Sequence, residues 1–139
     1  MKTKYQYFPD DSFFIIKLEG DVTMSDYKQS ALVLNKNTHW KEAKKVLLDM
    51  RSAFSSKKKV FTKELTHIRK SAHFPNYRLA YLVDDPQLIA NLELYIQASH
   101  LEGFYKYFST IKAAIHHLEI SQTASEVEEK IEQLEHEYP

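Results

Sequence analysis

The chain has 139 residues, of which 43% are hydrophobic and 27% charged, a composition typical of one folded domain with a real hydrophobic core. Its 19 basic and 19 acidic side chains cancel, which argues against nucleic-acid binding because that function needs a basic excess. The absence of cysteine excludes disulfides, thiolate catalysis and cysteine zinc sites, and a total of two glycines excludes glycine-rich phosphate-binding loops.

Hydrophobic periodicity and turn residues predict alternating strands and helices. The first two strands, joined by four turn residues, indicate an antiparallel hairpin, and strands separated by helices should be parallel neighbours with right-handed crossovers. The predicted elements are strands at 5–8 and 13–18, a helix from 23 to about 37, a strand at 46–49, a loop at 51–56, a helix from 56 to about 72, a strand at 77–83, a helix from 86, a strand at 104–108 and a helix from 109 to 118. This β-β-α-β-α-β-α-β-α order predicts an α/β fold with a mixed, mostly parallel sheet.

A few residues set the predicted boundaries of these elements. Thr23, Asp85 and Ser109 are expected to cap helix N-termini. Gly20 is expected to break the second strand, and Gly103 to take the left-handed conformation after the third helix. The aromatic side chains are expected to be mostly core residues.

Residues 121–139 differ in kind from the rest. The apolar residues there recur at spacings of four, three and four, namely Val127, Ile131, Leu134 and Tyr138. Glutamates lie between them. This pattern predicts an amphipathic acidic helix, which is too short to be stable alone. We therefore divide the chain into a domain at 1–120 and a C-terminal helix at 121–139 that docks on its own domain, docks on a second subunit, or frays.

The sequence also bears on the compartment. No apolar run approaches the roughly 18 residues of a membrane span. The N-terminus lacks the apolar core of a signal peptide, and the lack of cysteine fits a reducing compartment. We expect a cytoplasmic protein.

Four short motifs follow one another along residues 4–118. They are GDVT at 20–23, VLLDMR at 46–51, AYLVDDP at 80–86 and FSTIKAA at 108–114. In this order and spacing they resemble the SpoIIAA-like branch of the STAS-type domains, where STAS names the sulfate-transporter and anti-sigma-factor-antagonist domain. The resemblance implies a small bacterial domain that is not an enzyme, needs no cofactor and acts by binding proteins, or sometimes small molecules or lipids. A regulatory protein–protein interaction is thus the expected function, with an apolar-ligand or lipid-binding module as the alternative and an enzyme as the third option.

In the anti-sigma-factor antagonists, a serine at the start of the helix after the third strand is phosphorylated. The corresponding region here contains Ser55, Ser56 and Lys57, without the acidic residue and the glycine of the family's site. Because a helix N-terminus favours an anion, these three residues are a candidate phosphorylation or anion site. The alternative is a solvated helix cap.

Two charged runs of opposite sign stand out. Residues 57–70 hold six basic groups against Glu64, a net of +5, whereas residues 121–139 hold six glutamates and Lys130, a net of −5. Such runs favour docking within one chain or between subunits, and the alternative is two solvated faces. The candidate interaction residues, for a protein partner or a homo-oligomer, are Lys58, Lys59, Lys63, Val127, Ile131 and Leu134.

Polar residues near the ends of neighbouring strands form the last candidate site, namely Asp49, Arg51, Asp84 and Asp85. Ligands of open α/β sheets settle outside the carboxyl ends of the strands, where the acids could act as general bases or metal ligands. Helix capping already accounts for Asp84 and Asp85, and an ion pair with Arg51 for Asp49. The histidines form no HxxxH or HExxH pair, and His116 with Glu119 makes only a weak metal-binding pair. We expect no catalytic residue and no bound metal.

Overall fold

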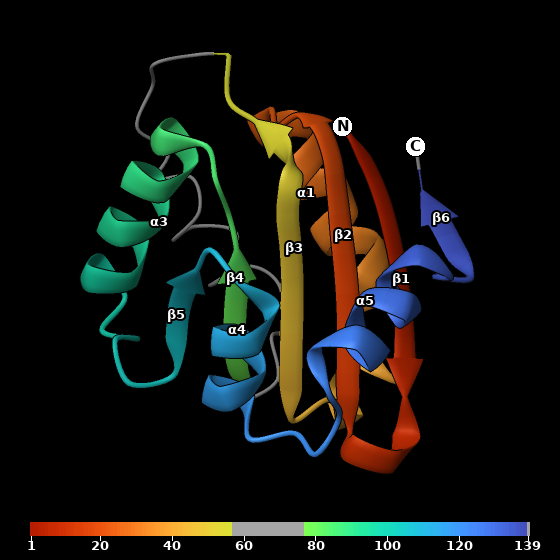
Figure 1. Cartoon of the computed structure of the whole chain (residues 1–139). Helices are drawn as coiled ribbons and strands as arrows, with labels where there is room; N and C mark the ends of the chain where they lie inside the picture. The colour runs from red at the N-terminus through yellow and green to blue at the C-terminus, as the bar shows by residue number, and fades with distance from the viewer. Residues whose placement is uncertain (57–76, 139) are drawn as a thin grey trace.

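Figure 1 shows the chain in a computed structural model that describes residues 1–56 and 77–138. Within these ranges, six strands form one sheet with helices on both faces. The strands are β1 (Lys2–Phe8), β2 (Phe13–Asp21), β3 (Lys45–Phe54), β4 (Arg78–Leu82), β5 (Tyr105–Phe108) and β6 (His136–Tyr138). The helices are α1 (Met24–Asn35), α3 (Pro86–Ala98), α4 (Ile111–Leu118) and α5 (Ala124–Glu132).

The strands lie in the order β5-β4-β3-β2-β1-β6. β2, β3, β4 and β5 are parallel neighbours, whereas β1 is antiparallel to both β2 and β6. The predicted α/β class with a mixed, mostly parallel sheet is therefore confirmed, including the antiparallel first strand.

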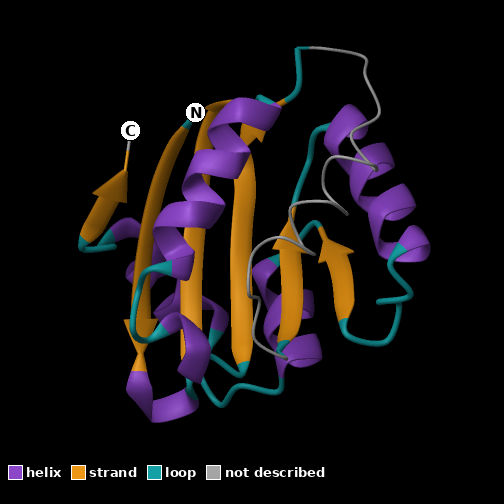
Figure 2. Cartoon of the chain, turned by 180° about the vertical axis from the view of Figure 1, so that it is seen from behind, coloured by secondary structure: helices purple, strands orange, loops and turns teal. Residues whose placement is uncertain are grey.

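The core consists of two layers, one on each face of the sheet. Alternate strand residues such as Phe14 and Val46 pack toward α1 and α3, which cover the face seen in Figure 2. Their neighbours Phe13, Ile15 and Leu47 pack toward α4 and α5 on the opposite face. Burial on both faces explains why these strands read as continuous apolar runs in the sequence.

Two strands are longer than predicted. β2 continues through Gly20 to Asp21, so Gly20, at φ +92°, does not break it. β3 runs on to Phe54, so the predicted loop at 51–56 is mostly strand. Both strands extend because they pair with each other again, from Glu19 to Asp21 and from Ser52 to Phe54, beyond a bulge-like shift in register after Lys17.

The helix caps were partly predicted. Thr23 and Asp85 accept hydrogen bonds from backbone N–H groups three residues later, as expected. Two other predictions about helix ends, one for α4 and one for α3, are wrong. Thr110, not Ser109, caps α4, with Ala113 N donating to its Oγ1 at 3.3 Å, and the left-handed residue after α3 is His100, at φ +56°, not Gly103.

The C-terminal segment packs on its own sheet. α5 begins with a capping box between Thr123 and Glu126 and buries Val127 and Ile131 in the second core layer. The helix ends at Glu132, shorter than predicted. Leu134 is partly buried beyond it, and Tyr138 belongs to β6, where it pairs with Thr3 of β1 rather than continuing a helical stripe.

The described part of the chain contains no helix with the length and apolar character that crossing a bilayer requires.

Candidate functional site

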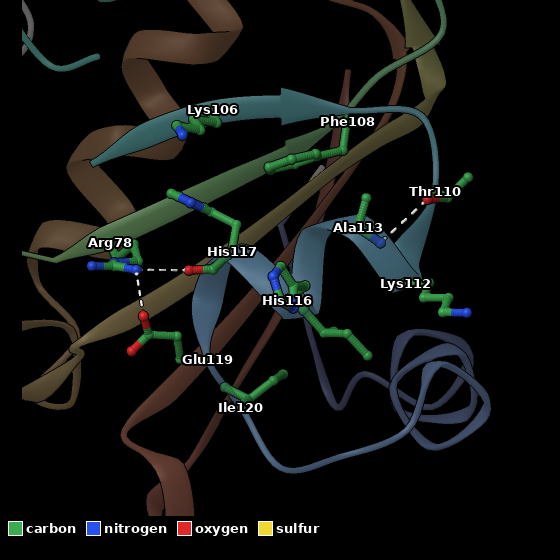
Figure 3. A pocket seen from close by; sticks show the side chains of 11 residues that line it. Arg78, Lys106, Phe108, Thr110, Lys112, Ala113, His116, His117, Glu119 and Ile120 are labelled. Carbon is green, nitrogen blue, oxygen red and sulfur yellow. Dashed lines mark hydrogen bonds and ion pairs between the residues drawn. The ribbon is translucent and has the colours of Figure 1, made fainter. Parts of the chain in front are cut away.

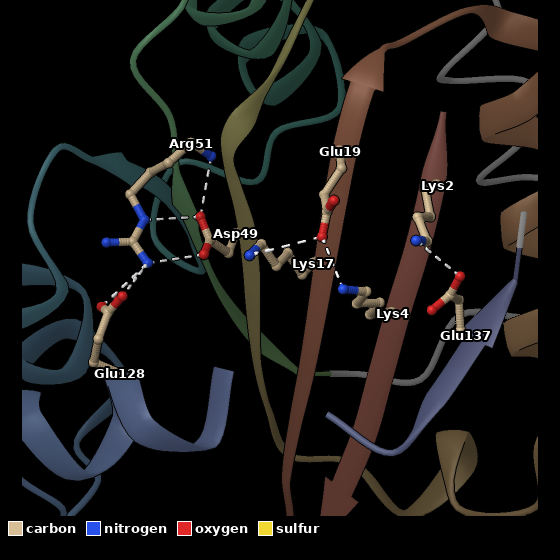
Figure 4. A network of polar contacts seen from close by, with 8 residues as sticks. All are labelled: Lys2, Lys4, Lys17, Glu19, Asp49, Arg51, Glu128 and Glu137. Carbon is tan, nitrogen blue, oxygen red and sulfur yellow. Dashed lines mark hydrogen bonds and ion pairs between the residues drawn. The ribbon is translucent and has the colours of Figure 1, made fainter. Parts of the chain in front are cut away.

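The predicted ion pair between Asp49 and Arg51 is present, but inside β3 rather than at its end. Both side chains lie on the α4/α5 face, where Asp49 is 1% exposed (Figure 4). Arg51 donates from Nε and Nη2 to the two carboxylate oxygens, each at 2.9 Å, and its backbone N–H donates at 3.0 Å. Hydrogen bonding to Asp49 raises the pKa of the Arg51 guanidinium above its ordinary value, so the guanidinium stays charged.

A residue that the sequence did not indicate completes this network. Glu128 of α5 lies 3.2 Å from Nη2 of Arg51, which links the C-terminal helix to the middle of the sheet (Figure 4). Asp84 and Asp85 play other parts: Asp84 is exposed, and Asp85 caps α3 by accepting from Leu88 N at 2.9 Å. The four predicted strand-end residues therefore split into the ion pair of buried Asp49 with half-buried Arg51, the exposed Asp84 and the helix cap Asp85.

Ser56 is held by a carboxylate. Its backbone N–H donates to Asp21 Oδ1 at 3.0 Å, and its hydroxyl donates to the other oxygen of Asp21. Asp21 would repel a phosphate on this serine. Ser55 is half-buried beside it. Lys57 lies outside the described residues, so the anion site stays a prediction.

The acidic C-terminal segment has described partners within its own chain. Besides the pairing of Glu128 with Arg51, Glu137 pairs with Lys2 at 3.0 Å. Lys130 lies 4.7 Å above the ring of Phe8. The predicted basic partners Lys58, Lys59 and Lys63, and the whole run at 57–70, lie outside the described residues, so docking on them stays a prediction.

The exposed edge of β5 was not predicted as a site. Leu79 N donates to Phe104 O at 2.9 Å and Val83 N to Phe108 O at 3.1 Å, so alternate residues of this segment bond inward to β4. By the alternation of a parallel ladder, the N–H and C=O of Tyr107 point away from the sheet. Two aromatic side chains predicted as core are exposed here, Phe104 at 53% and Tyr107 at 37%.

Each face of this edge is hollowed. On the α4 side a groove of about 860 Å³ is lined by Arg78, Lys106, Phe108, Lys112 and His117, among others (Figure 3). On the α3 side a smaller hollow of about 390 Å³ is lined by Glu93, Ile96, Gln97, Tyr105 and Tyr107, among others. Lys106 and Phe108 line both hollows, so β5 forms the ridge between them.

Arg78 lies at one end of the α4-side groove and holds the end of α4 there. Its Nη1 donates to His117 O at 3.0 Å and pairs with Glu119 at 3.1 Å, which closes the C-terminal turn of α4 (Figure 3). Glu119 thus serves as the partner of Arg78, not as a metal-binding partner of His116. In the described ranges, no three histidine, aspartate and glutamate side chains gather closely enough to share a metal ion.

The ring of His117 lies across β4 and β5. Nε2 is 3.2 Å from Leu79 O and 3.1 Å from Phe104 O, and since both are carbonyl acceptors, this nitrogen carries the proton. Burial lowers the pKa of His117, with a further contribution from the charge of Arg78. The ring is therefore neutral at pH 7 and leaves Nδ1 as a hydrogen-bond acceptor at the groove.

Comparison with protein-family models gives no match for this chain, and comparison with curated proteins gives none either. The likeness to STAS-type domains therefore rests on the four motifs alone.

Proposed function

We propose that this chain is a non-catalytic regulatory domain of the STAS type that binds a partner protein along the exposed edge of β5. The observation that carries the proposal is that β5 is the edge strand among those the structure describes, and its outward-pointing main chain has a hollow on each face. An unpaired edge is a template for pairing with another chain. The exposed rings of Phe104 and Tyr107 add apolar area beside it, which is typical of interaction surfaces.

The other functions considered receive less support. A cavity that described residues line between α1 and the sheet measures about 50 Å³, which leaves no room for a lipid there. Among the described acids, Asp49 is the most buried, and both of its carboxylate oxygens are bonded to Arg51, so it is not poised as a general base.

The proposal is tested by photocrosslinking in cells of the source organism. Benzoylphenylalanine replaces Tyr107 in one variant and Leu32, 44% exposed on α1, in the control. We expect one discrete protein to be crosslinked from position 107 and not from position 32. The same protein, once purified, should bind the unlabelled chain, and Lys106→Asp should weaken that binding at least tenfold while Lys36→Asp, just after α1, leaves it unchanged. The absence of a specific adduct at position 107 would refute binding through this edge.

A further inference from the structure

We propose that the edge of β5 accepts an extended strand of the partner that carries acidic side chains at every second position. This inference rests on the proposed protein-binding function and names the chemistry of the partner.

The main chain of β5 supplies the pairing. Phe104 and Phe108 accept hydrogen bonds from β4, so the peptide groups of Tyr107, between them, face the open side. An added strand would bond to these groups and extend the sheet beyond the six strands that the structure describes. This is the mode in which main-chain bonds provide the affinity and alternate side chains provide the specificity.

The two hollows set which side chains fit. Successive side chains of a strand point to opposite faces, so one set of an added strand would enter the α4-side groove and the other set the α3-side hollow. β5 follows the same alternation: Phe108 packs on the α4 face against the ring of His117, and Tyr105 packs on the α3 face against Tyr77. Each hollow would therefore contact every second side chain of the added strand.

The charges of the two hollows differ in sign. The α4-side groove holds Arg78, Lys106 and Lys112 against Glu119. Arg78 is paired with Glu119, whereas the ion pairs found among the described residues use neither Lys106 nor Lys112. Lys106 and Lys112 are thus available to pair with acidic side chains of a partner on this face.

The α3-side hollow has the opposite preference. Glu93 and Glu102 line it without a second cation besides Lys106, and the hydroxyl of Tyr107 donates to Glu93. The remainder is largely apolar, with Ile96 and Tyr105 on its floor. Acidic side chains are therefore favoured only at the alternate positions that face α4, with apolar ones between them.

A second copy of this chain fits the edge less well. Antiparallel pairing of β5 with itself would place the α4-side grooves of both copies on one face of a continuous sheet. Lys106 and Lys112 of each copy would then gather with those of the other, and like charges across a strand pair are destabilising. The short length of β5 and its central lysine are also the usual protection against unspecific edge pairing.

The test uses two synthetic eight-residue peptides, one alternating valine with glutamate and one alternating valine with lysine. Each is titrated into the full, ¹⁵N-labelled chain and followed by NMR. We expect the glutamate peptide to bind at least tenfold more tightly than the lysine peptide, with the largest amide shifts at Tyr107 and its neighbours. A glutamate peptide N-methylated at alternate residues keeps its side chains but cannot complete the pairing, and it should lose binding.

The charge-reversal variant Lys106→Glu/Lys112→Glu should invert the preference between the two peptides. The matched control Lys28→Glu/Lys36→Glu changes two exposed lysines on and just after α1, with the same change in net charge, and should leave the preference intact.

Three results would overturn the inference: equal binding of the two peptides, undiminished binding of the N-methylated peptide, or a dimer in sedimentation that Lys106→Glu dissociates. A partner crosslinked from position 107 would still stand in the first two cases, so failure of strand addition is distinguishable from failure of the proposed function.

Discussion

The α4/α5 face of the sheet has two unlike halves. On one side of α4, the helix α5 closes the face, burying Val127 and Ile131 and joining Glu128 to Arg51. On the other side of α4, next to β5, the face is hollow and its cations Lys106 and Lys112 are left to solvent.

The difference shows what holds the acidic C-terminal segment in place. Burying an apolar side chain such as Val127 or Ile131 contributes about 1.5–3 kcal/mol. An exposed ion pair such as Lys2–Glu137 is screened by solvent and adds little to stability. Glu129 and Glu132 point to solvent. Within the described residues, the segment is thus docked mainly by its apolar stripe, and ion pairs at Arg51 and Lys2 add to it.

The largest expected effect in the closed half comes from Arg51→Met. The substitution leaves the buried Asp49 carboxylate without its cation, and breaking a buried pair in this way costs about 3–5 kcal/mol of unfolding free energy. Urea denaturation measures the loss. The double variant Asp49→Leu/Arg51→Met replaces both charges and should recover most of it. If the double variant is no more stable than the single one, the buried charge is not the cause.

The next largest effect is expected for Ile131→Ala. This side chain is buried against the sheet, and its truncation should lower the unfolding free energy by about 2–4 kcal/mol. The counterpart at the open half is Phe104→Ala, which removes an exposed ring and should change stability by less than about 0.5 kcal/mol. Equal losses in the two variants would contradict the contrast between the halves.

A smaller effect is expected for Thr123→Ala at the start of α5. The variant loses the hydrogen bond from Glu126 N, at 3.2 Å, and with it the capping box, at a cost of about 1 kcal/mol. Thr123→Ser keeps the hydroxyl and should retain most of the stability. Thermal unfolding of the three proteins distinguishes the loss of the cap from a change in packing.

The smallest effect lies at the open half and depends on pH. Because the folded pKa of His117 is lowered from its ordinary value of about 6.5, its contribution to stability is complete above that value and declines as the pH falls toward the lowered one. His117→Gln retains a donor to the carbonyls and does not titrate, so its stability should fall less between pH 7 and pH 5. Urea denaturation at both pH values tests this, and parallel declines would rule out His117 as the source.

Local signals predicted most elements of the fold. The apolar runs of β2, β3 and β4, the caps Thr23 and Asp85, and the antiparallel first strand follow from side-chain chemistry and spacing alone. The errors occur where neighbours decide. Gly20 stays in β2 because Ala53 of β3 pairs with it beyond the shift in register. In the structure Thr110 caps α4, although the adjacent Ser109 has the same capping chemistry.

The open edge could not be predicted because strand order is not a local property. Arg78, Lys106 and Lys112 come from β4, β5 and α4, and they line one groove beside β5, the outermost of the described strands on that side. β6 was missed for a similar reason, since its three residues pair with β1 from the far end of the chain.

The late position of α5 and β6 in the chain has a consequence for synthesis. The ribosome makes β1 to β5 before it makes α5 and β6. α5 packs against the face that holds Phe13, Ile15 and Leu47, and β6 pairs with the edge of β1. During that interval an apolar sheet face and a second strand edge lie uncovered, the state in which nascent chains associate wrongly or recruit chaperones. We therefore expect residues 124–138 to dock last during folding, and we expect a chain truncated before them to aggregate.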